Sequence, residues 1–337
     1  MNSEVIKGKK ALVVGGAGYI GSHIVKHLCE ADCDVTVYDN ISTGILSNID
    51  GRAGFIEGDI LNTDALTQTL STGFDIVFHF AALKAAGDSM KFPGEYAHNN
   101  INGSLSLLRA MDKTGVKNLV FSSTAAVYGS PQYLPMDELH PKAPENFYGF
   151  SKLVIEQNIE WFGKLKGMNY AVLRYFNAAG YDVTGGSYTR EKNAQNLAAV
   201  IMEVAAGLRE KLLVFGNDYP TKDGTGIRDY IHTNDLTTAH ILAFEHLLAG
   251  KESFIANLGT GSGFTVLEMI RAAEEATGVT IPYEIVERRE GDPSEVVAVA
   301  NLANSILGWK AEHSDLKTIF SSMVPFYFPY KNPEIEE

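Results

Sequence analysis

Lys10-Ala-Leu-Val-Val-Gly-Gly-Ala-Gly-Tyr-Ile-Gly21 is the stretch that decides the fold of this 337-residue chain. Its first five residues form a short apolar run, typical of a strand buried in a parallel sheet. Glycines follow at positions 15, 18 and 21, and the apolar residues after them recur at helical spacing. A strand, a glycine-rich turn and a helix in this order predict a unit that cradles a dinucleotide.

Each glycine of this turn has its own expected role. Gly15 makes the tight turn, Gly18 lets the backbone approach a pyrophosphate, and Gly21 allows the helix to pack closely on the strand. The helix N-terminus then faces the pyrophosphate. A packed turn without a ligand is the alternative, and the strand, the helix and the acidic residue described next disfavour it.

That acidic residue is Asp39, at the end of a second predicted strand, Asp34–Tyr38, about 20 residues after the glycines. Its carboxylate can accept both ribose hydroxyls of an adenosine. A 2′-phosphate would meet the same negative charge, and no arginine follows closely. The sequence therefore favours NAD over NADP as the cofactor.

Further strand-like runs alternate with amphipathic stretches of helical length. They lie at residues 55–57, 76–80, 119–122 and 170–174. This alternation predicts an α/β fold with a Rossmann-type, doubly wound parallel sheet. We expect an NAD-binding domain over residues 1–177 and a smaller α/β substrate lobe over 178–337, with segments near 228–262 rejoining the sheet.

Composition limits the class of protein. The net charge of −13 and the lack of a basic stripe argue against binding to nucleic acid or anionic lipid. No apolar run approaches the roughly 20 residues that a membrane helix needs, and the N-terminus lacks the apolar core of a secretory signal, so a cytoplasmic location is expected. Cys29 and Cys33 are too few for a zinc site, so we expect free thiols and no bound metal.

Proton-transfer chemistry is indicated by Tyr148-Gly-Phe-Ser-Lys152, which places a phenol and an ammonium on one face of a predicted helix. A phenol titrates near pH 10, but a neighbouring ammonium and a positively charged nicotinamide both favour the phenolate. We expect Tyr148 to act as the base and Lys152 to hold the nicotinamide ribose as well. A surface Tyr–Lys pair is the alternative that the spacing alone allows.

The predicted strand that starts at Leu119 breaks into the hydroxyl residues Ser122, Ser123 and Thr124 at its carboxyl end. Open α/β sheets bind their ligands at that edge. We expect Thr124 to hydrogen-bond a substrate oxygen. Capping of the following turn accounts equally well for the two serines.

Together these motifs resemble the UDP-glucose 4-epimerase family of the extended short-chain dehydrogenase/reductase superfamily, over nearly the whole chain. The glycine turn, Asp39 and the Tyr–Lys pair are shared by the superfamily. The motifs FGNDYPTKDGTGIRDYIH, NLGTGSG and RREGD in the C-terminal half are the family's own substrate-lobe signatures.

The resemblance implies an isomerase of galactose metabolism that interconverts UDP-glucose and UDP-galactose with a tightly held NAD. The base takes the proton of the sugar 4-hydroxyl while NAD takes a hydride from C4. The keto sugar then turns about its phosphate linkages, and return of the hydride inverts C4. The resemblance also implies a homodimer paired through helices near residues 94–111 and 148–162.

Binding residues also follow from the resemblance. The NAD set is Gly15, Gly18, Tyr19, Ile20, Gly21, Asp39, Asn40, Ile41, Ser42, Thr43, Gly44, Asp59, Ile60, Phe80, Ala81, Ala82, Lys84, Asn99, Ser122, Tyr148, Lys152 and Phe176. The UDP-sugar set is Lys84, Thr124, Tyr148, Asn177, Asn196, Leu197, Val214, Phe215, Arg228, Arg289, Asp292 and Val296. Arginine forks suit a diphosphate, and an apolar slot suits uridine. A solvated surface pair is the alternative for the two arginines.

Two positions depart from the family's usual pattern. The family often has serine where this chain has Thr124, and the hydroxyl is retained. Where this chain has Val296, some members carry tyrosine and others a small residue that leaves room for an N-acetyl group at C2. The valine predicts that UDP-GlcNAc and UDP-GalNAc are interconverted too.

Competing functions fit less well. A nucleotide-sugar 4,6-dehydratase needs an acidic pair directly after the hydroxyl residue, where this chain has Ala125 and Ala126. A simple dehydrogenase would release its reduced cofactor and show net turnover of it. A non-catalytic NAD-sensing protein would leave Tyr148 and Lys152 without a role.

Overall fold

The computed structural model describes residues 4–185, 194–289 and 291–328. Its main body is a seven-stranded sheet in the order β11-β6-β5-β4-β1-β2-β3, in which the paired strands run parallel. The strands are β1 (Lys10–Val14), β2 (Asp34–Asp39), β3 (Gly54–Glu57), β4 (Ile76–His79), β5 (Asn118–Thr124), β6 (Asn169–Tyr175) and β11 (Phe254–Leu258). The predicted Rossmann-type α/β fold is confirmed.

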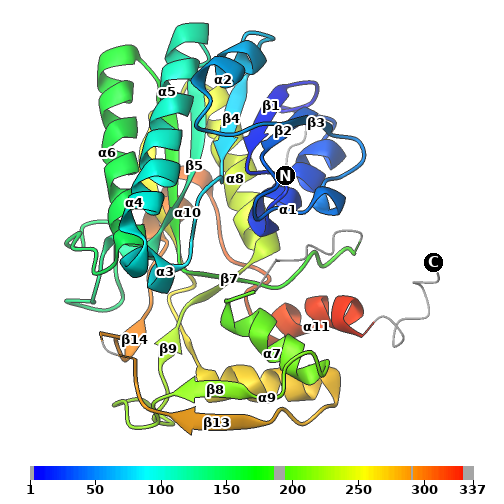
Figure 1. The fold of residues 1–337 in the computed structure, drawn as a ribbon, viewed down its shortest axis with the longest axis vertical. Coiled ribbons are helices and arrows are strands. Elements are labelled where there is room, and N and C mark those ends of the chain that lie inside the picture. Colours follow the sequence, from blue (N-terminus) through cyan, green and yellow to red (C-terminus); the bar gives the residue numbers. More distant parts are fainter. Residues whose placement is uncertain (1–3, 186–193, 290, 329–337) are drawn as a thin grey trace.

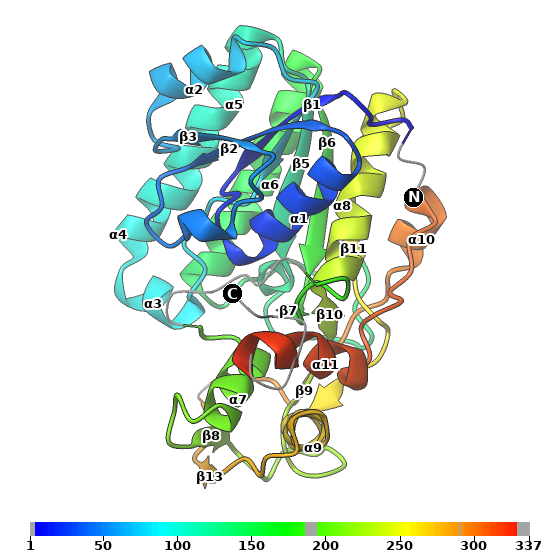
Figure 2. The same cartoon turned by 90° about the vertical axis from the view of Figure 1, so that its right-hand side faces the viewer.

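Helices cover both faces of this sheet (Figure 2). On one face lie α1 (Tyr19–Glu30) and α8 (Thr233–Leu248), and on the other lie α2 (Thr63–Leu70), α5 (Gly103–Thr114) and α6 (Phe147–Lys166). The strand period of two sorts the core between the faces. In β1, Ala11 and Val13 join the cluster under α1 and α8, whereas Leu12 and Val14 join the cluster under the other three helices.

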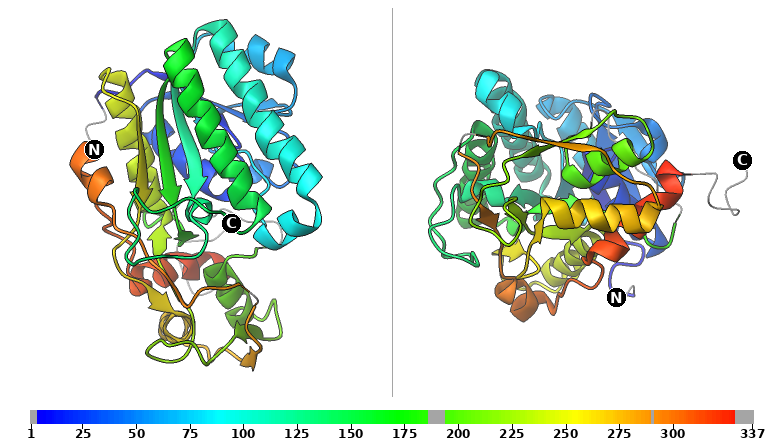
Figure 3. Two further views of the ribbon diagram at one scale, coloured as in Figure 1. Left: turned by 90° about the vertical axis from the view of Figure 1, so that its left-hand side faces the viewer. Right: turned by 90° about the horizontal axis from the view of Figure 1, so that it is seen from below.

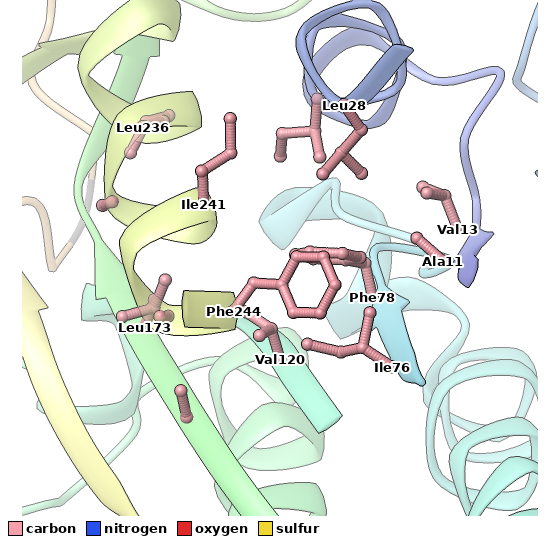
Figure 4. Packing of buried hydrophobic residues seen from close by; sticks show 14 of the residues in the cluster. Ala11, Val13, Leu28, Ile76, Phe78, Val120, Leu173, Leu236, Ile241 and Phe244 are labelled. Carbon is pink, nitrogen blue, oxygen red and sulfur yellow. The ribbon is translucent and has the colours of Figure 1, made fainter. Parts of the chain in front are cut away.

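The core under α8 is built on an aromatic contact. Phe244 of α8 meets Phe78 of β4 edge to face, with 5.7 Å between the ring centroids (Figure 4). Ile76, Val120 and Leu173 complete the sheet side of this cluster. The contact fixes α8 onto the centre of the main sheet.

The chain order of the strands reverses between β1 and β4, which are hydrogen-bonded neighbours. At such a switch point the connections leave the sheet in opposite directions and open a crevice at the carboxyl ends of the strands. The turns that follow β1, β2, β4 and β5 all lie at this edge. Segments α3 (Ala86–Lys91), α4 (Pro93–Tyr96), the π-helix η2 (Ala97–Asn102) and the 3-10 turn η3 (Ala125–Val127) surround it.

A smaller lobe lies below the sheet in Figure 1 and has its own core. Its helices are α7 (Leu197–Ala205), α9 (Val266–Thr277) and α11 (Leu316–Tyr327), and its strands β8 (Leu212–Phe215) and β13 (Tyr283–Val286) pair in parallel. Short strands lie between the two bodies: β7 (Asn177–Ala179) with β10 (Tyr230–His232), and β9 (Ile227–Arg228) with β12 (Phe264–Thr265) and β14 (Glu295–Val296). Helix α10 (Asn301–Leu307) packs near α8 and β11 (Figure 3).

Helix α1 contacts the segment that leads into the lobe at two points. The Tyr19 hydroxyl donates to the Gly180 carbonyl at 2.5 Å. Two helical turns further along α1, the Lys26 ammonium forms a buried ion pair with Asp182 and donates to the Gly185 carbonyl at 3.0 Å. The helix that begins at the glycine turn therefore holds both the sheet and the start of the lobe.

Three sequence expectations about composition concern these described segments. Cys29 and Cys33 are free thiols, as predicted, and Cys33 follows the end of α1. Within the described ranges no group of histidine, cysteine or acidic side chains is arranged to hold a metal ion. No helix in the same ranges has the length and apolar character needed to cross a bilayer.

Candidate active site

The glycine turn after β1 is as tight as its sequence indicates. Gly15 has φ +84°, and a Cβ added there would lie 2.4 Å from the Ala81 nitrogen. A Cβ on Gly21 would lie 2.3 Å from the Gly15 carbonyl oxygen, so this glycine sets how closely α1 approaches β1. At Gly18 the nearest atom would be 3.4 Å away. The outer side of the turn therefore keeps its backbone accessible to a ligand.

Asp39 ties this turn to the loop that follows β2. Its Oδ2 accepts from the Ala17 nitrogen at 3.0 Å, and its Oδ1 accepts from the Ile41 nitrogen at 2.8 Å. Ile41 has φ +55°, a conformation that costs a β-branched residue energy and needs support. Asn40 extends the network by donating to the Asp59 carboxylate at 3.1 Å. The carboxylate is thus held at the carboxyl end of β2 by two backbone donors.

A cavity of about 390 Å³ lies at the switch point. It is bordered by most of the predicted NAD residues: Gly15, Gly18, Tyr19, Ile20, Gly21, Asp39, Asn40, Ser42, Thr43, Gly44, Ile60, Phe80, Ala81, Ala82, Lys84, Asn99, Ser122, Tyr148 and Lys152. Ile41, Asp59 and Phe176 do not border it. One cavity thus joins the glycine turn and Asp39 to the Tyr–Lys pair.

Sequence reasoning missed several residues that border the same cavity. They are Val14, Tyr38, Gly58, Leu83, Ala85, Asp88, Tyr96, Tyr175 and Gln195. Position at the carboxyl ends of strands was a usable signal for Val14, Tyr38 and Tyr175, because residues there face the crevice of an open α/β sheet. The others lie on connecting segments whose path the sequence pattern does not reveal.

Tyr148 is placed by a tight contact between α6 and the turn η3. The Asn146 side chain caps α6 by accepting from the Gly149 nitrogen at 2.8 Å. A Cβ on Gly149 would lie 2.3 Å from the Ala126 carbonyl oxygen, so only glycine permits this approach. The contact brings Tyr148, in the first turn of α6, to Thr124, with which it forms a side-chain hydrogen bond.

Thr124 has two partners. Its hydroxyl oxygen accepts from the Ala126 nitrogen at 3.2 Å and thereby caps η3. Its hydrogen bond to Tyr148 favours the phenolate. Ser122 instead pairs with the Tyr175 hydroxyl, and Ser123 donates to Glu156 at 2.5 Å. The capping residue is therefore Thr124, and neither serine has that role.

Burial is the dominant influence on the Tyr148 phenol. It raises the pKa of Tyr148 to about 12, against the effect of the Thr124 hydrogen bond. The sequence predicted that a neighbouring ammonium would make this phenol more acidic. Within the protein itself the balance runs the other way, because removal from water disfavours the phenolate more than the local partners favour it.

Lys152 is held by β5. Its ammonium donates to the Ser122 carbonyl at 2.8 Å and lies 4.7 Å from the centroid of the Phe121 ring. The residue is 2% exposed, and burial lowers the pKa of Lys152 to about 7, with Glu156 opposing the shift. The ammonium and the neutral amine therefore differ little in free energy near neutral pH.

Several predicted UDP-sugar residues lie outside this cavity, on or near the short strands β8, β9 and β14. Arg228 of β9 pairs with Asp292. The Arg289 guanidinium lies 3.8 Å from the centroid of the Phe215 ring, at the end of β8. Val296 pairs in register with Arg228, so β14 and β9 bring these side chains to one small sheet.

The remaining predicted lobe residues have structural partners. Asn196 caps α7 by accepting from the Ala199 nitrogen at 2.9 Å, and Leu197 is the first residue of that helix. Asn177 donates to the Asp229 carbonyl at 3.1 Å. Val214 is buried in the lobe core, whereas Phe215 is half-buried and its ring meets the Arg289 guanidinium.

Another stacked pair in the lobe was missed. The Arg288 guanidinium lies 4.0 Å from the centroid of the Tyr219 ring, and its Nε donates to Asp218 at 2.5 Å. Arg288 and Arg289 thus each stack on an aromatic residue from β8 or the loop after it. The sequence showed both arginines but not that each would meet an aromatic ring.

Comparison with known proteins covers both bodies of the structure. The model of the NAD dependent epimerase/dehydratase family matches residues 11–259. UDP-glucose 4-epimerase from Lacticaseibacillus casei is 45% identical over 311 residues, which cover 92% of this chain and 94% of that protein.

Solved structures agree with these matches. UDP-glucose 4-epimerase from Brucella ovis in complex with NAD is 41% identical, with a TM-score of 0.92 over 95% of this chain and 98% of that one. UDP-glucose 4-epimerase from Bifidobacterium longum in complex with NAD+ and UDP is 38% identical, with a TM-score of 0.89 over 96% of this chain and 99% of that one.

Proposed function

This chain belongs to the NAD dependent epimerase/dehydratase family, and we propose that it is an NAD-dependent enzyme that interconverts UDP-glucose and UDP-galactose at C4 of the sugar. One observation carries the proposal. The phenol of Tyr148, the ammonium of Lys152 and the dinucleotide turn at Gly15 border a single cavity. A protein that only binds a dinucleotide has no use for the first two.

The residues at the switch point fit NAD. The turn excludes a Cβ at Gly15 and Gly21 but leaves the outer side of Gly18 accessible, as a bound pyrophosphate requires. Asp39 offers its carboxylate to the adenosine ribose and would repel a 2′-phosphate. When bound, NAD supplies the chemistry of hydride removal from C4 of the sugar and of hydride return to it.

Three side chains handle the proton. Tyr148 removes the proton of the sugar 4-hydroxyl and returns it after the sugar has turned. Thr124 donates its hydroxyl hydrogen to the Tyr148 oxygen and stabilises the phenolate. Lys152, fixed by the Ser122 carbonyl, supplies a positive charge beside the same cavity. Lys152 is buried and Thr124 and Tyr148 are half-buried, so little bulk water competes for the proton.

The lobe holds the UDP part. We propose that Arg228 and Arg289 bind the diphosphate, and that the Phe215 ring supports the uracil. Arg228 is half-buried and already orientated by Asp292, so its fork is arranged before the ligand arrives. Anchoring the nucleotide strongly and the hexose weakly lets the hexose turn and present either face of C4 to the cofactor.

Tyr148→Phe tests the proposal directly. The purified protein is incubated with UDP-galactose and no added cofactor, and the products are separated by chromatography. Loss of the base is expected to lower kcat by about 10²- to 10⁴-fold. Tyr133→Phe, at an exposed tyrosine, is the matched control and is expected to keep full activity. Undiminished epimerisation by Tyr148→Phe would refute the assigned base.

Absence of net cofactor turnover separates the epimerase from a dehydrogenase. The protein is expected to convert UDP-galactose without any lasting change in absorbance at the reduced-cofactor band. Denaturation of the same sample is expected to release about one dinucleotide per chain.

We also propose that the N-acetylated pair UDP-GlcNAc and UDP-GalNAc is accepted. Val296 is half-buried and packs against the cluster formed by Val127, Tyr128, Met136 and Ala298, and Val127 ends the turn η3 that follows Thr124. Tyrosine at this position would fill the space that a C2 substituent needs. Val296→Tyr is therefore expected to keep activity on UDP-galactose and to lose it on UDP-GalNAc. Equal rejection of the acetylated sugars by both proteins would contradict the idea.

Finally, we propose that the enzyme acts as a homodimer in the cytoplasm, in galactose metabolism. Helix α6 supports the dimer, because it exposes Phe150, Trp161 and Leu165 at 43%, 56% and 66%. Sedimentation equilibrium measures the oligomer. Trp161→Glu is expected to shift it towards the monomer, and a monomeric wild type would contradict the proposal.

A further inference from the structure

A ladder of polar contacts joins α6 to β5 below the site. Tyr148, Lys152 and Glu156 follow one another at intervals of four residues, so they lie on one face of α6. Each meets the carboxyl end of β5: Tyr148 bonds Thr124, Lys152 bonds the Ser122 carbonyl, and the Ser123 hydroxyl donates to Glu156 at 2.5 Å. Glu156 is the member of this ladder that the proposed chemistry does not use.

Glu156 is part of a fully buried ion pair. It and Arg174 of β6 are each 1% exposed. The Arg174 Nε donates to Oε1 at 2.9 Å and its second terminal nitrogen donates to Oε2 at 2.5 Å, which is bidentate geometry. Arg174 also donates to the Tyr128 hydroxyl at 2.9 Å. Burying such a pair often gains no stability over apolar residues of the same volume, so its presence points to another use.

We propose that Glu156 is a positioning residue that keeps Lys152 in its ammonium form, and that Arg174 limits how strongly Glu156 does so. This inference rests on the proposed function, because it assigns a role to the charge of Lys152. Glu156 lies one helical turn from Lys152 and shares its burial, so little water screens the attraction between the two charges.

The other groups around Lys152 do not supply this negative charge. His79 of β4 is uncharged at neutral pH, since burial and then Lys152 lower the pKa of His79 to about 3. Tyr148 and Tyr175 are neutral phenols there, because burial raises the pKa of each. On β5, the Phe121 ring and the Ser122 carbonyl contribute only partial charges. Among the described residues, Glu156 is the charged group whose field raises the pKa of Lys152.

The position of that pKa makes the effect functional. Burial leaves the pKa of Lys152 at about 7 even with Glu156 in place. A further decrease would leave the amine mostly neutral at physiological pH, and the charge beside Tyr148 would be lost. Each unit of decrease reduces the ammonium fraction about tenfold at a pH above the pKa.

The test measures the Lys152 pKa directly in the NAD-loaded enzyme. Lysine labelled with 13C at Cε is followed by NMR across pH, and the Lys152 signal is assigned by its absence from the Lys152→Met spectrum. Glu156→Gln is expected to lower the pKa by about one unit or more. The alkaline limb of kcat for UDP-galactose is expected to move to lower pH by the same amount.

Two further variants separate electrostatics from structure. Glu156→Gln with Arg174→Met removes both charges, so the Lys152 pKa is expected to lie between those of wild type and Glu156→Gln. This double variant also keeps the test available if Glu156→Gln alone does not fold. Glu160→Gln makes the same change at an exposed position on α6 and is expected to leave the Lys152 titration unchanged.

A Lys152 pKa that is equal in wild type and in the folded variants would overturn the inference, even if the variants are less heat-stable. Failure of the proposed function would look different. Wild-type protein that binds NAD but does not epimerise UDP-galactose would refute the function, and the NMR titration would still decide the role of Glu156.

Discussion

Asp39→Asn changes one acceptor oxygen into a donor at the point where the glycine turn meets the loop after β2. In the structure one carboxylate oxygen accepts from the Ala17 nitrogen at 3.0 Å and the other accepts from the Ile41 nitrogen at 2.8 Å. An amide has a single oxygen, so one of these backbone donors must face an NH2 group. The same substitution removes the negative charge that we assign to the adenosine ribose.

The size of the effect follows from the bonds lost. A hydrogen bond to a charged acceptor contributes about 1.5–3 kcal/mol, and every 1.4 kcal/mol corresponds to roughly a tenfold change in binding. Loss of one such bond is expected to weaken NAD binding roughly 10- to 150-fold. Ile41, with φ +55°, loses part of its support, so the loop after β2 is expected to become less ordered as well.

The assay counts the dinucleotide retained per chain after dialysis and measures the dissociation constant of the dialysed protein by fluorescence titration. Asp34→Asn is the matched control, because Asp34 is an exposed aspartate at the other end of the same strand. The preference for NAD over NADP is expected to narrow in Asp39→Asn alone. Equal NAD affinity in the two variants would refute the role that the geometry gives to Asp39.

Three further predictions concern other parts of the molecule. Thr124→Val removes the hydrogen bond that favours the phenolate, so the pKa of Tyr148 is expected to rise and kcat at pH 7 to fall about 10- to 100-fold, whereas Thr124→Ser stays near wild type in the same pH–rate profile. Lys26→Met leaves Asp182 buried without its cation and is expected to cost about 3–5 kcal/mol in denaturant unfolding. Burial disfavours the Asp182 carboxylate, but hydrogen bonds from Lys26 and Thr184 lower the pKa of Asp182 to about 2. The stability that the ion pair contributes is therefore present above about pH 4. It is lost as pH falls towards 2, and the difference between variant and wild type is expected to narrow there. Gly149→Ala would place a Cβ 2.3 Å from a carbonyl oxygen of η3, so kcat is expected to fall more than NAD binding does, as single-turnover kinetics and NAD titration would show.

The sequence predicted the main sheet well because its signals are local. Apolar runs marked its strands: β1 begins and ends where its run does, and β2, β3, β4 and β6 differ from their predicted runs by no more than one residue at either end. The N-cap of α6 is a local feature too, because Asn146 accepts from the Gly149 nitrogen three residues further on.

Features that depend on tertiary contacts were not visible. Gly149 reads as one more residue of a motif until the structure places the Ala126 carbonyl 2.3 Å from where its Cβ would be. Nothing in the spacing marks Glu156 and Arg174 as buried, because charged residues on an amphipathic helix or at a strand end are usually solvated. Their burial follows from the packing of α6 over β5 and β6, which periodicity does not specify.

The pKa of Tyr148 likewise differs between what the spacing of charges predicts and what packing determines. Spacing indicated an ammonium beside a phenol, and charge alone then argues for a more acidic phenol. Packing adds a larger opposing effect, because the contact that brings α6 to β5 also removes both groups from water. A buried base and a buried ammonium each tend towards neutrality, and the protein must supply charge to prevent that. The charges alternate in sign along Arg174, Glu156 and Lys152, which lead from β6 through one face of α6 to the neutral Tyr148 phenol at the cavity. Glu156, held by Arg174, thus helps a water-excluded site to keep the positive charge of Lys152.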